Sequence, residues 1–257
     1  MDRIIRRENL TEEERKLEEY FIKEATLHSK EHVETYKNFL SSLNGRYICS
    51  DLMKETFAFY TESRETRNAY NYIVHNSAAT LTNELYKEQV KDENITDCIF
   101  LTGIPGAGKS FFVQSLNLEG EIPDNVMIYE ESITTDTIID KISLARENNK
   151  RVHIIVINST LELAYQNVLT RIKESGRGAS IQTMAKIASG LYEAVKRLYT
   201  MFNNELEIGI YKKEENDKIE IYTGIEEIEE LNIGSYEEVL KRLEEIKEEE
   251  QTYGIKR

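Results

Sequence analysis

Residues 103–110, GIPGAGKS, match the pattern Gly-x-x-x-x-Gly-Lys-Ser/Thr in full. In such a loop, glycines let backbone N–H groups surround a phosphate, and the positive end of the following helix points at the same anion. We expect Lys109 to reach the β- and γ-phosphates of a nucleotide, and the hydroxyl of Ser110 to bind Mg²⁺. The residues predicted to contact the nucleotide are Gly103, Pro105, Gly106, Ala107, Gly108, Lys109, Ser110 and Phe111. A chance Gly-rich turn is the alternative, but the apolar segment before the loop and the helical pattern after it favour nucleotide binding.

Two arginines further along the chain suit phosphoryl transfer. Arg171 lies near the end of a predicted helix, and Arg177 lies between two glycines in the sequence TRIKESGRG. A kinase needs cations that balance the charge on the transferring group, and a mobile lid can carry them. We therefore predict that both arginines are catalytic residues on a lid, with surface arginines in a turn as the alternative. The chain has no Asn-Lys-x-Asp motif and no apolar strand that ends in Asp-Glu, so we disfavour a switch GTPase and an AAA-type ATPase.

Together these motifs resemble the zeta toxins, a family of P-loop kinases whose characterised members phosphorylate UDP-N-acetylglucosamine. The resemblance covers roughly residues 45–225, and it also rests on Glu130, on Ser132 and on the hairpin-like segment EIGIYKKEENDKIEIY. It implies that Glu130 and Ser132 orient the acceptor and that Tyr211 borders the adenine. The family has Glu-Gly-Thr where this chain has Glu130-Glu131-Ser132, so the acidic and hydroxyl roles carry over and the glycine does not.

The family's catalytic Asp lies on the strand after the P-loop helix, in the pattern Asp-x-x-Lys, and this chain has no such residue there. The pattern occurs upstream instead, where Asp51 and Lys54 follow a short strand-like segment. We predict a rearranged kinase, in which the strand and helix that carry the base precede the phosphate loop. Asp51 is then the catalytic base and Lys54 binds substrate, although a helix N-cap is the alternative for Asp51. His75, on the helix behind them, is expected to pack or hydrogen-bond rather than to act as a base.

The elements that must position these residues alternate between strands and helices. Short apolar strands are predicted at 46–50, 97–102, 126–129 and 153–157, with a hairpin over 206–222. Helices are predicted over 30–42, 52–88, 111–116, 134–148, 160–174 and 181–203, and capping boxes start two more at Thr11 and Ser235. This alternation predicts an α/β fold, a P-loop kinase-like parallel sheet covered by helices. We expect a helical N-terminal extension (1–44), the P-loop domain (45–232) and a C-terminal helix (233–257).

Composition narrows the class of protein further. The chain has 257 residues and a formal net charge of −14. General binding to a nucleic-acid backbone requires clustered cations, so this acidic composition disfavours it. It contains no apolar run of the roughly 18 residues that a membrane span requires, and its start does not resemble a signal peptide. Its two cysteines, Cys49 and Cys98, have no metal-binding or disulfide pattern. We expect a cytoplasmic protein that does not span a membrane and whose cysteines bind no metal.

The function that this sequence predicts is an ATP- and Mg²⁺-dependent kinase that phosphorylates a hydroxyl of a small metabolite, with a UDP-sugar as the candidate acceptor. The alternatives are a polynucleotide 5′-kinase and a non-catalytic nucleotide-binding module. The resemblance also implies an antitoxin as a protein partner. Residues 1–44 could imitate that inhibitor within the chain, but simple packing is the favoured interpretation of amphipathic helices.

Overall fold

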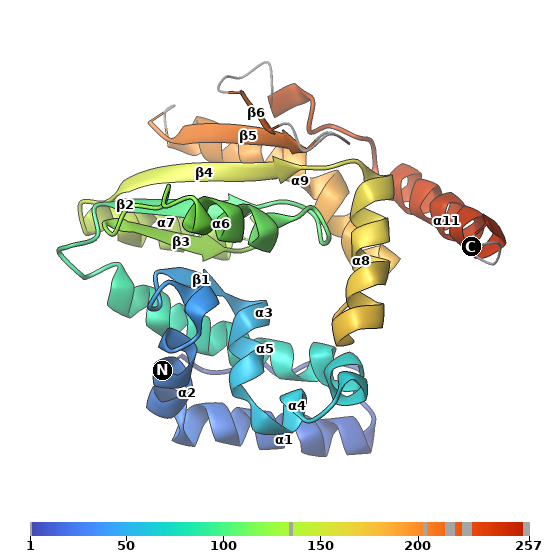
Figure 1. The fold of residues 1–257 in the computed structure, drawn as a ribbon, viewed down its shortest axis with the longest axis horizontal. Helices are drawn as coiled ribbons and strands as arrows, with labels where there is room; N and C mark the ends of the chain where they lie inside the picture. The colour runs from blue at the N-terminus through green and yellow to red at the C-terminus, as the bar shows by residue number, and fades with distance from the viewer. Residues whose placement is uncertain (1, 134–135, 203–204, 214–218, 223–227, 254–257) are drawn as a thin grey trace.

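The computed structural model describes residues 2–133, 136–202, 205–213, 219–222 and 228–253. Its centre is a sheet with the strand order β1-β3-β2-β4-β5-β6, which Figure 1 shows edge to edge. The strands are β1 (Tyr47–Cys49), β2 (Asp97–Thr102), β3 (Val126–Glu130), β4 (Arg151–Asn158), β5 (Glu207–Lys213) and β6 (Ile219–Tyr222). The first five are parallel, and β6 pairs antiparallel with β5. The predicted α/β class and the predicted hairpin are both confirmed.

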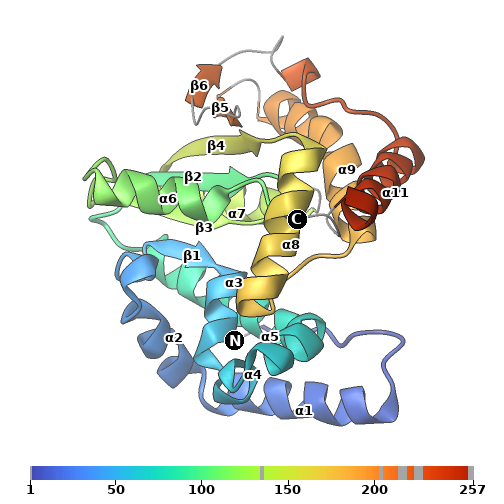
Figure 2. The same ribbon diagram turned by 45° about the vertical axis from the view of Figure 1, so that its right-hand side comes forward.

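Helices cover both faces of this sheet, as Figures 1 and 2 show from two directions. The helices that bury side chains against one face are α5 (Arg64–Gln89), α7 (Thr137–Glu147) and the second half of α9 (Ile181–Met201). Those on the other face are α6 (Lys109–Leu118), α8 (Leu161–Ser175) and α11 (Tyr236–Tyr253). Because both faces are covered, β2 and β3 are buried along almost their whole length.

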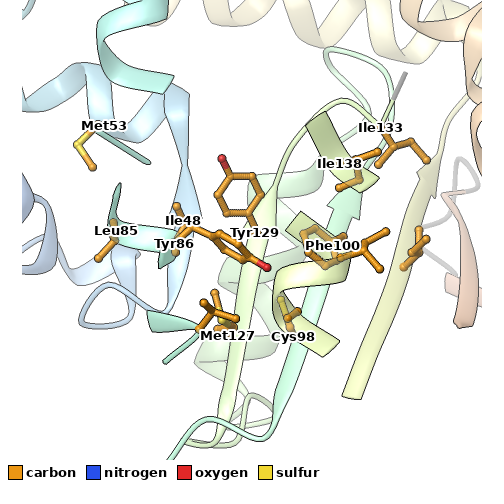
Figure 3. Close-up of a cluster of buried hydrophobic side chains, with 14 of the residues drawn as sticks. Ile48, Met53, Leu85, Tyr86, Cys98, Phe100, Met127, Tyr129, Ile133 and Ile138 are labelled. Atoms are coloured by element: carbon orange, nitrogen blue, oxygen red, sulfur yellow. The ribbon is translucent and has the colours of Figure 1, made fainter. Parts of the chain in front are cut away.

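Aromatic side chains join the sheet to α5 and α7, and Figure 3 shows them in the core. The rings of Tyr86 on α5 and Tyr129 on β3 meet edge to face, with centroids 5.0 Å apart. Their buried hydroxyls are satisfied, because Tyr86 donates to the carbonyl of Lys141 (2.6 Å) and Tyr129 to the side chain of Asn83 (2.8 Å). These contacts hold α5 against β3, the strand that pairs with β1.

The N-terminal helices α1 (Glu12–Leu27) and α2 (Ser29–Lys37) pack on α5, beside the edge strand β1. α1 begins at the predicted capping box and packs on α5. α2 ends earlier than the predicted residue 42 because a 3₁₀ turn replaces its last part. Tyr36 of α2 is fully buried, and its hydroxyl donates to the carbonyl of Tyr47 (2.7 Å) and accepts from the amide of Cys49 (2.9 Å). One side chain thus provides hydrogen bonds for a carbonyl and an amide on the edge of β1 that faces away from β3. The hydrophobic core also continues across the predicted boundary at residues 44 and 45.

The segment predicted as one helix over 52–88 is divided into several. It contains α3 (Ser50–Met53), a 3₁₀ turn, α4 (Ala58–Thr61) and the long α5. Ser63 and Thr66 cap the start of α5 reciprocally, which ends the preceding irregular part. The N-cap alternative for Asp51 is wrong, because Cys49 is the N-cap of α3 and Asp51 lies within the first turn. The Asp51 carboxylate is therefore directed to side chains rather than to the helix end.

The strand order places β1 in the same sheet as the later strand β2, which leads into the phosphate loop. β1 precedes β2 in the chain, yet β3 lies between them and is parallel to both. The carboxyl ends of β1, β2 and β3 therefore meet at one end of the sheet, where α/β proteins place their ligand sites.

At the C-terminus, Ser235 and Glu238 form the predicted capping box, and α11 packs on α9 and α8. Within the described residues, no helix combines the length and apolarity needed to cross a membrane.

Candidate active site

The phosphate loop leads from β2 into α6, as its motif predicts. α6 begins at Lys109, after Gly108 with a φ of 96°. Gly106 has a φ of 84°, and a Cβ at this position would lie 2.1 Å from the carbonyl oxygen of Ala164 on α8. The side chain of Asn167 also donates to the carbonyl of Gly106 (2.8 Å). Only glycine fits between the loop and α8, which fixes the loop's path.

Lys109 and Ser110 lie beside Glu130, which ends β3. The ammonium of Lys109 donates to the carbonyls of Gly103 and Ile104, each at 3.1 Å, and lies 3.8 Å from Glu130 Oε1. The hydroxyl of Tyr47 donates to Glu130 Oε2 (2.5 Å) and lies 3.4 Å from Ser110 Oγ. Glu130 therefore lies beside the phosphate loop, and its predicted role in orienting an acceptor stays a prediction.

Asp51 lies between two cations, Lys54 and Arg171. It accepts from Lys54 Nζ at 2.8 Å and from Arg171 Nη2, on α8, at 3.3 Å. Lys54 is buried and also donates to the side chain of Asn71 on α5 at 2.8 Å. The Lys54 ammonium, followed by the Arg171 guanidinium, holds the pKa of Asp51 well below its usual range. Asp51 is therefore ionised at neutral pH, and its two oxygens have distinct partners.

The loop between α8 and α9 carries Arg177 and is anchored against α5. Arg64 donates to the carbonyl of Lys173 (2.9 Å), and Asn71 donates to that of Gly178 (3.2 Å). Arg177 lies 3.9 Å from Glu55, whose carboxylate is also bound by Arg67 at 3.0 Å. The structure places the arginine at the site, and the movement of this loop as a lid stays a prediction.

One cavity of about 490 Å³ unites most of the predicted site, and we call it the charged cavity. The predicted catalytic and substrate-binding residues that line it are Asp51, Lys54, Lys109, Glu130, Ser132, Arg171 and Arg177. Gly103 and Pro105 of the phosphate loop line it as well. Residues from β1–α3, from the phosphate loop and from α8–α9 therefore face a single space.

Tyr211 and Phe111 are not part of this assembly. The Tyr211 ring packs edge to face on Phe112, with centroids 4.7 Å apart, and borders a depression with Asp97 and His153 near the other end of the strands. Phe111, at the start of α6, is 59% exposed and lines none of the described cavities at the phosphate loop. The structure gives no support for Tyr211 as a neighbour of the adenine.

A second cavity, of about 720 Å³, lies on the other side of the phosphate loop, and we call it the apolar cavity. Its apolar lining includes Ile104, Ile157, Leu161, Leu191, Leu231 and Ile233. Lys212 also lines it, paired with Glu230, and Arg242 of α11 does so while paired with Glu162. Sequence reasoning missed this cavity because its residues come from six separate segments with no common motif.

Four further residues of the charged cavity were not predicted as site residues. They are Arg7, Asn71, Tyr72 and His75. Burial and the nearby Lys54 lower the pKa of His75 to about 3, so this ring is neutral at neutral pH. The sequence signal for Asn71 and His75 is their spacing of four residues, which places both on one face of α5.

Comparison with known proteins adds no family to this description. No protein-family model matches the chain, and no curated protein matches it significantly in sequence. The function must therefore be argued from the geometry of the two cavities.

Proposed function

We propose that this chain is an ATP- and Mg²⁺-dependent kinase that phosphorylates a hydroxyl group of a small metabolite. The observation that carries the proposal is that Asp51 and Lys109 face the same cavity, although a whole helix and a strand separate them in the chain. A carboxylate and a phosphate-binding lysine in one space are the two parts that phosphoryl transfer to a hydroxyl requires. The resemblance to zeta toxins supports a nucleotide sugar as the acceptor.

The phosphate end of the site suits a magnesium nucleotide. Lys109 and the loop amides would hold the β- and γ-phosphates, and the oxygens of Ser110 and Glu130 would hold Mg²⁺. Mg²⁺ prefers such hard oxygen ligands and takes its others from water and phosphate. This agrees with the absence, among the described residues, of any cluster of three or more acidic, His or Cys side chains that could hold a metal. When bound, the ion would neutralise charge on the transferring phosphate.

Asp51 would orient the acceptor hydroxyl and accept its proton. Because the transition state of phosphoryl transfer is loose, the hydroxyl needs correct positioning more than a strong base. A carboxylate with a lowered pKa meets that need, since it is ionised and fixed by Lys54. Arg171 contacts Asp51 at 3.3 Å, so a phosphoryl group that approaches Asp51 also approaches this guanidinium. Arg171 and Arg177 would then stabilise the transferring group.

The apolar cavity would take the nucleoside part of ATP. Neighbouring loop residues divide the two spaces, because Ile104 lines the apolar cavity and Pro105 lines the charged cavity. An aromatic base gains most from apolar walls, and most nucleotide sites combine such walls with a few polar groups. Lys212, Asn158 and Ser159 supply polar groups at that wall.

The proposal is tested by following ATP consumption and the phosphorylated product in the presence of Mg²⁺. The acceptor panel contains nucleotide sugars and a 5′-hydroxyl oligonucleotide. The proteins are wild type, Lys109→Ala and the matched control Lys30→Ala, whose lysine is exposed on α2. We expect acceptor-dependent transfer that Lys109→Ala abolishes and Lys30→Ala keeps. Transfer only to the oligonucleotide would establish a polynucleotide kinase instead. ATP binding without transfer to any acceptor would favour a non-catalytic module.

A further inference from the structure

The N-terminal segment before α1 runs along α5 and reaches the charged cavity. Asp2 pairs with Lys87 near the end of α5, and the carbonyl of Ile5 accepts from Asn76, about three turns earlier on the same helix. The guanidinium of Arg7 then lies over the ring of Tyr72, 4.1 Å from its centroid. Arg7 and Tyr72 both line the charged cavity. The segment thus delivers a cation to a site otherwise built from residues 49–187.

Arg7 is held in place by its backbone rather than by its charge. Its amide donates to Glu18 Oε1 at 2.6 Å, and Glu18 is almost completely buried. Its guanidinium stacks on Tyr72, while the Nε atom is buried and has no hydrogen-bond partner. A buried N–H without an acceptor costs stability, so it marks a position where an acceptor oxygen would be favourable.

The other cations of the charged cavity each face a carboxylate. Lys54 and Arg171 contact Asp51, Lys109 lies near Glu130, and Arg177 lies near Glu55. Among the described residues, no carboxylate lies within ion-pair distance of Arg7, although the chain has an excess of acidic residues. Glu131, the remaining acidic residue of this wall near the loop, pairs with Lys141. A cation left without a counter-charge in so acidic a protein is available to a ligand.

We propose that Arg7 forms, with Tyr72 and His75, an anion-binding subsite for a phosphate group that the acceptor already carries. This inference rests on the proposed kinase function, and it identifies the acceptor class as phosphate-bearing metabolites. A guanidinium suits this task because its parallel N–H groups match two phosphate oxygens. His75 lines the same cavity as Arg7 and Tyr72, and its neutral ring can share in the contact. The proposal thus gives the N-terminal segment a role in binding.

The experiment titrates inorganic phosphate into protein saturated with Mg²⁺ and the non-hydrolysable analogue AMP-PNP, so that the phosphate loop is occupied. The imidazole NMR signals of His75 report on the subsite, and the chain has only four histidines to distinguish. The variants are Arg7→Ala, Arg7→Lys and the control Arg6→Ala, because Arg6 is exposed and pairs with Glu19. Arg7→Ala keeps the backbone bond to Glu18, so thermal unfolding midpoints should confirm a folded protein.

We expect saturable shifts of His75 in wild type and in Arg6→Ala, with phosphate affinity at least about tenfold weaker in Arg7→Ala and intermediate in Arg7→Lys. Equal phosphate affinity in wild type and Arg7→Ala, or no saturable shift in wild type, would overturn the subsite. Failure of AMP-PNP to bind wild type would instead contradict the proposed function, so the two failures are distinguishable.

Discussion

The two cavities that meet at the phosphate loop differ in their lining. The charged cavity presents cations and carboxylates from β1–α3, the phosphate loop, α8 and the N-terminal segment. The apolar cavity presents Ile and Leu side chains, and its charged residues Lys212 and Arg242 already have carboxylate partners. The difference teaches that one loop can separate two tasks. One side offers charges, which suit the phosphates and the acceptor of the proposed reaction, and the other offers apolar surface, which suits a base.

This division predicts different kinetic consequences on the two sides. A change in the charged cavity should lower turnover, because it removes contacts that strengthen in the transition state. A change in the apolar cavity should weaken nucleotide binding and leave turnover unchanged, because the base does not react.

In the charged cavity, a large effect is expected from Arg177→Ala and Arg171→Ala. Removal of a cation that stabilises the transferring group should lower kcat about 10²- to 10³-fold, with a much smaller change in ATP affinity. Steady-state kinetics and AMP-PNP titration measure the two quantities. Arg197→Ala is the control, because Arg197 is exposed on α9 and pairs with Asp136. Equal losses of turnover and affinity would contradict a transition-state role.

A smaller effect is expected in the apolar cavity. Ile233 lines it and is 41% exposed, so Ile233→Glu can alter the wall without removing a core residue. The KM for ATP should rise about tenfold while kcat stays unchanged, because a charged carboxylate in this wall disfavours an apolar base. Leu40→Glu, at a fully exposed leucine, is the control. A fall in kcat at constant KM would show that this cavity is not the nucleoside site.

The smallest effect concerns stability and pH. The folded chain keeps His75 neutral down to a pKa of about 3, whereas an unfolded histidine titrates near ~6.5. The unfolded state therefore binds the extra proton first, and the free energy of unfolding falls as the pH drops from about 6.5 toward 3. This group contributes at most about 1.4 kcal/mol per pH unit.

Urea unfolding of His75→Gln across that pH range should show a shallower loss of stability than wild type. His28→Gln is the control, because His28 is largely exposed and pairs with Glu31. An identical pH dependence in wild type and His75→Gln would show that His75 is not held in its neutral form.

The parts of the fold that the sequence could predict depend on local patterns. The phosphate loop, the capping boxes at Thr11 and Ser235, and the apolar strands all lie within short segments. The placement of Asp51 was predictable only through its Asp-x-x-Lys spacing and the assumption that sheet order is kept. The position of β1 next to β3 agrees with that assumption.

The parts that could not be predicted depend on contacts between distant segments. Tyr36 on the edge of β1, Arg7 over Tyr72, and the walls of the apolar cavity each join residues with no common motif. The role of Tyr211 beside the adenine stays a prediction that rests on a matching hairpin sequence, and its ring packs on Phe112. Side-chain direction along a strand alternates, so the neighbouring Lys212 faces the apolar cavity instead.

The central claim is that a carboxylate encoded before the phosphate loop acts on phosphate bound by that loop. Phosphoryl transfer and AMP-PNP affinity should be measured together in wild type, in Asp51→Asn and in Asp140→Asn, whose carboxylate is exposed on α7. We predict that Asp51→Asn binds AMP-PNP within about twofold of wild type and loses about 10²- to 10⁴-fold in turnover, while Asp140→Asn retains both. Full turnover in a folded Asp51→Asn protein would contradict the account.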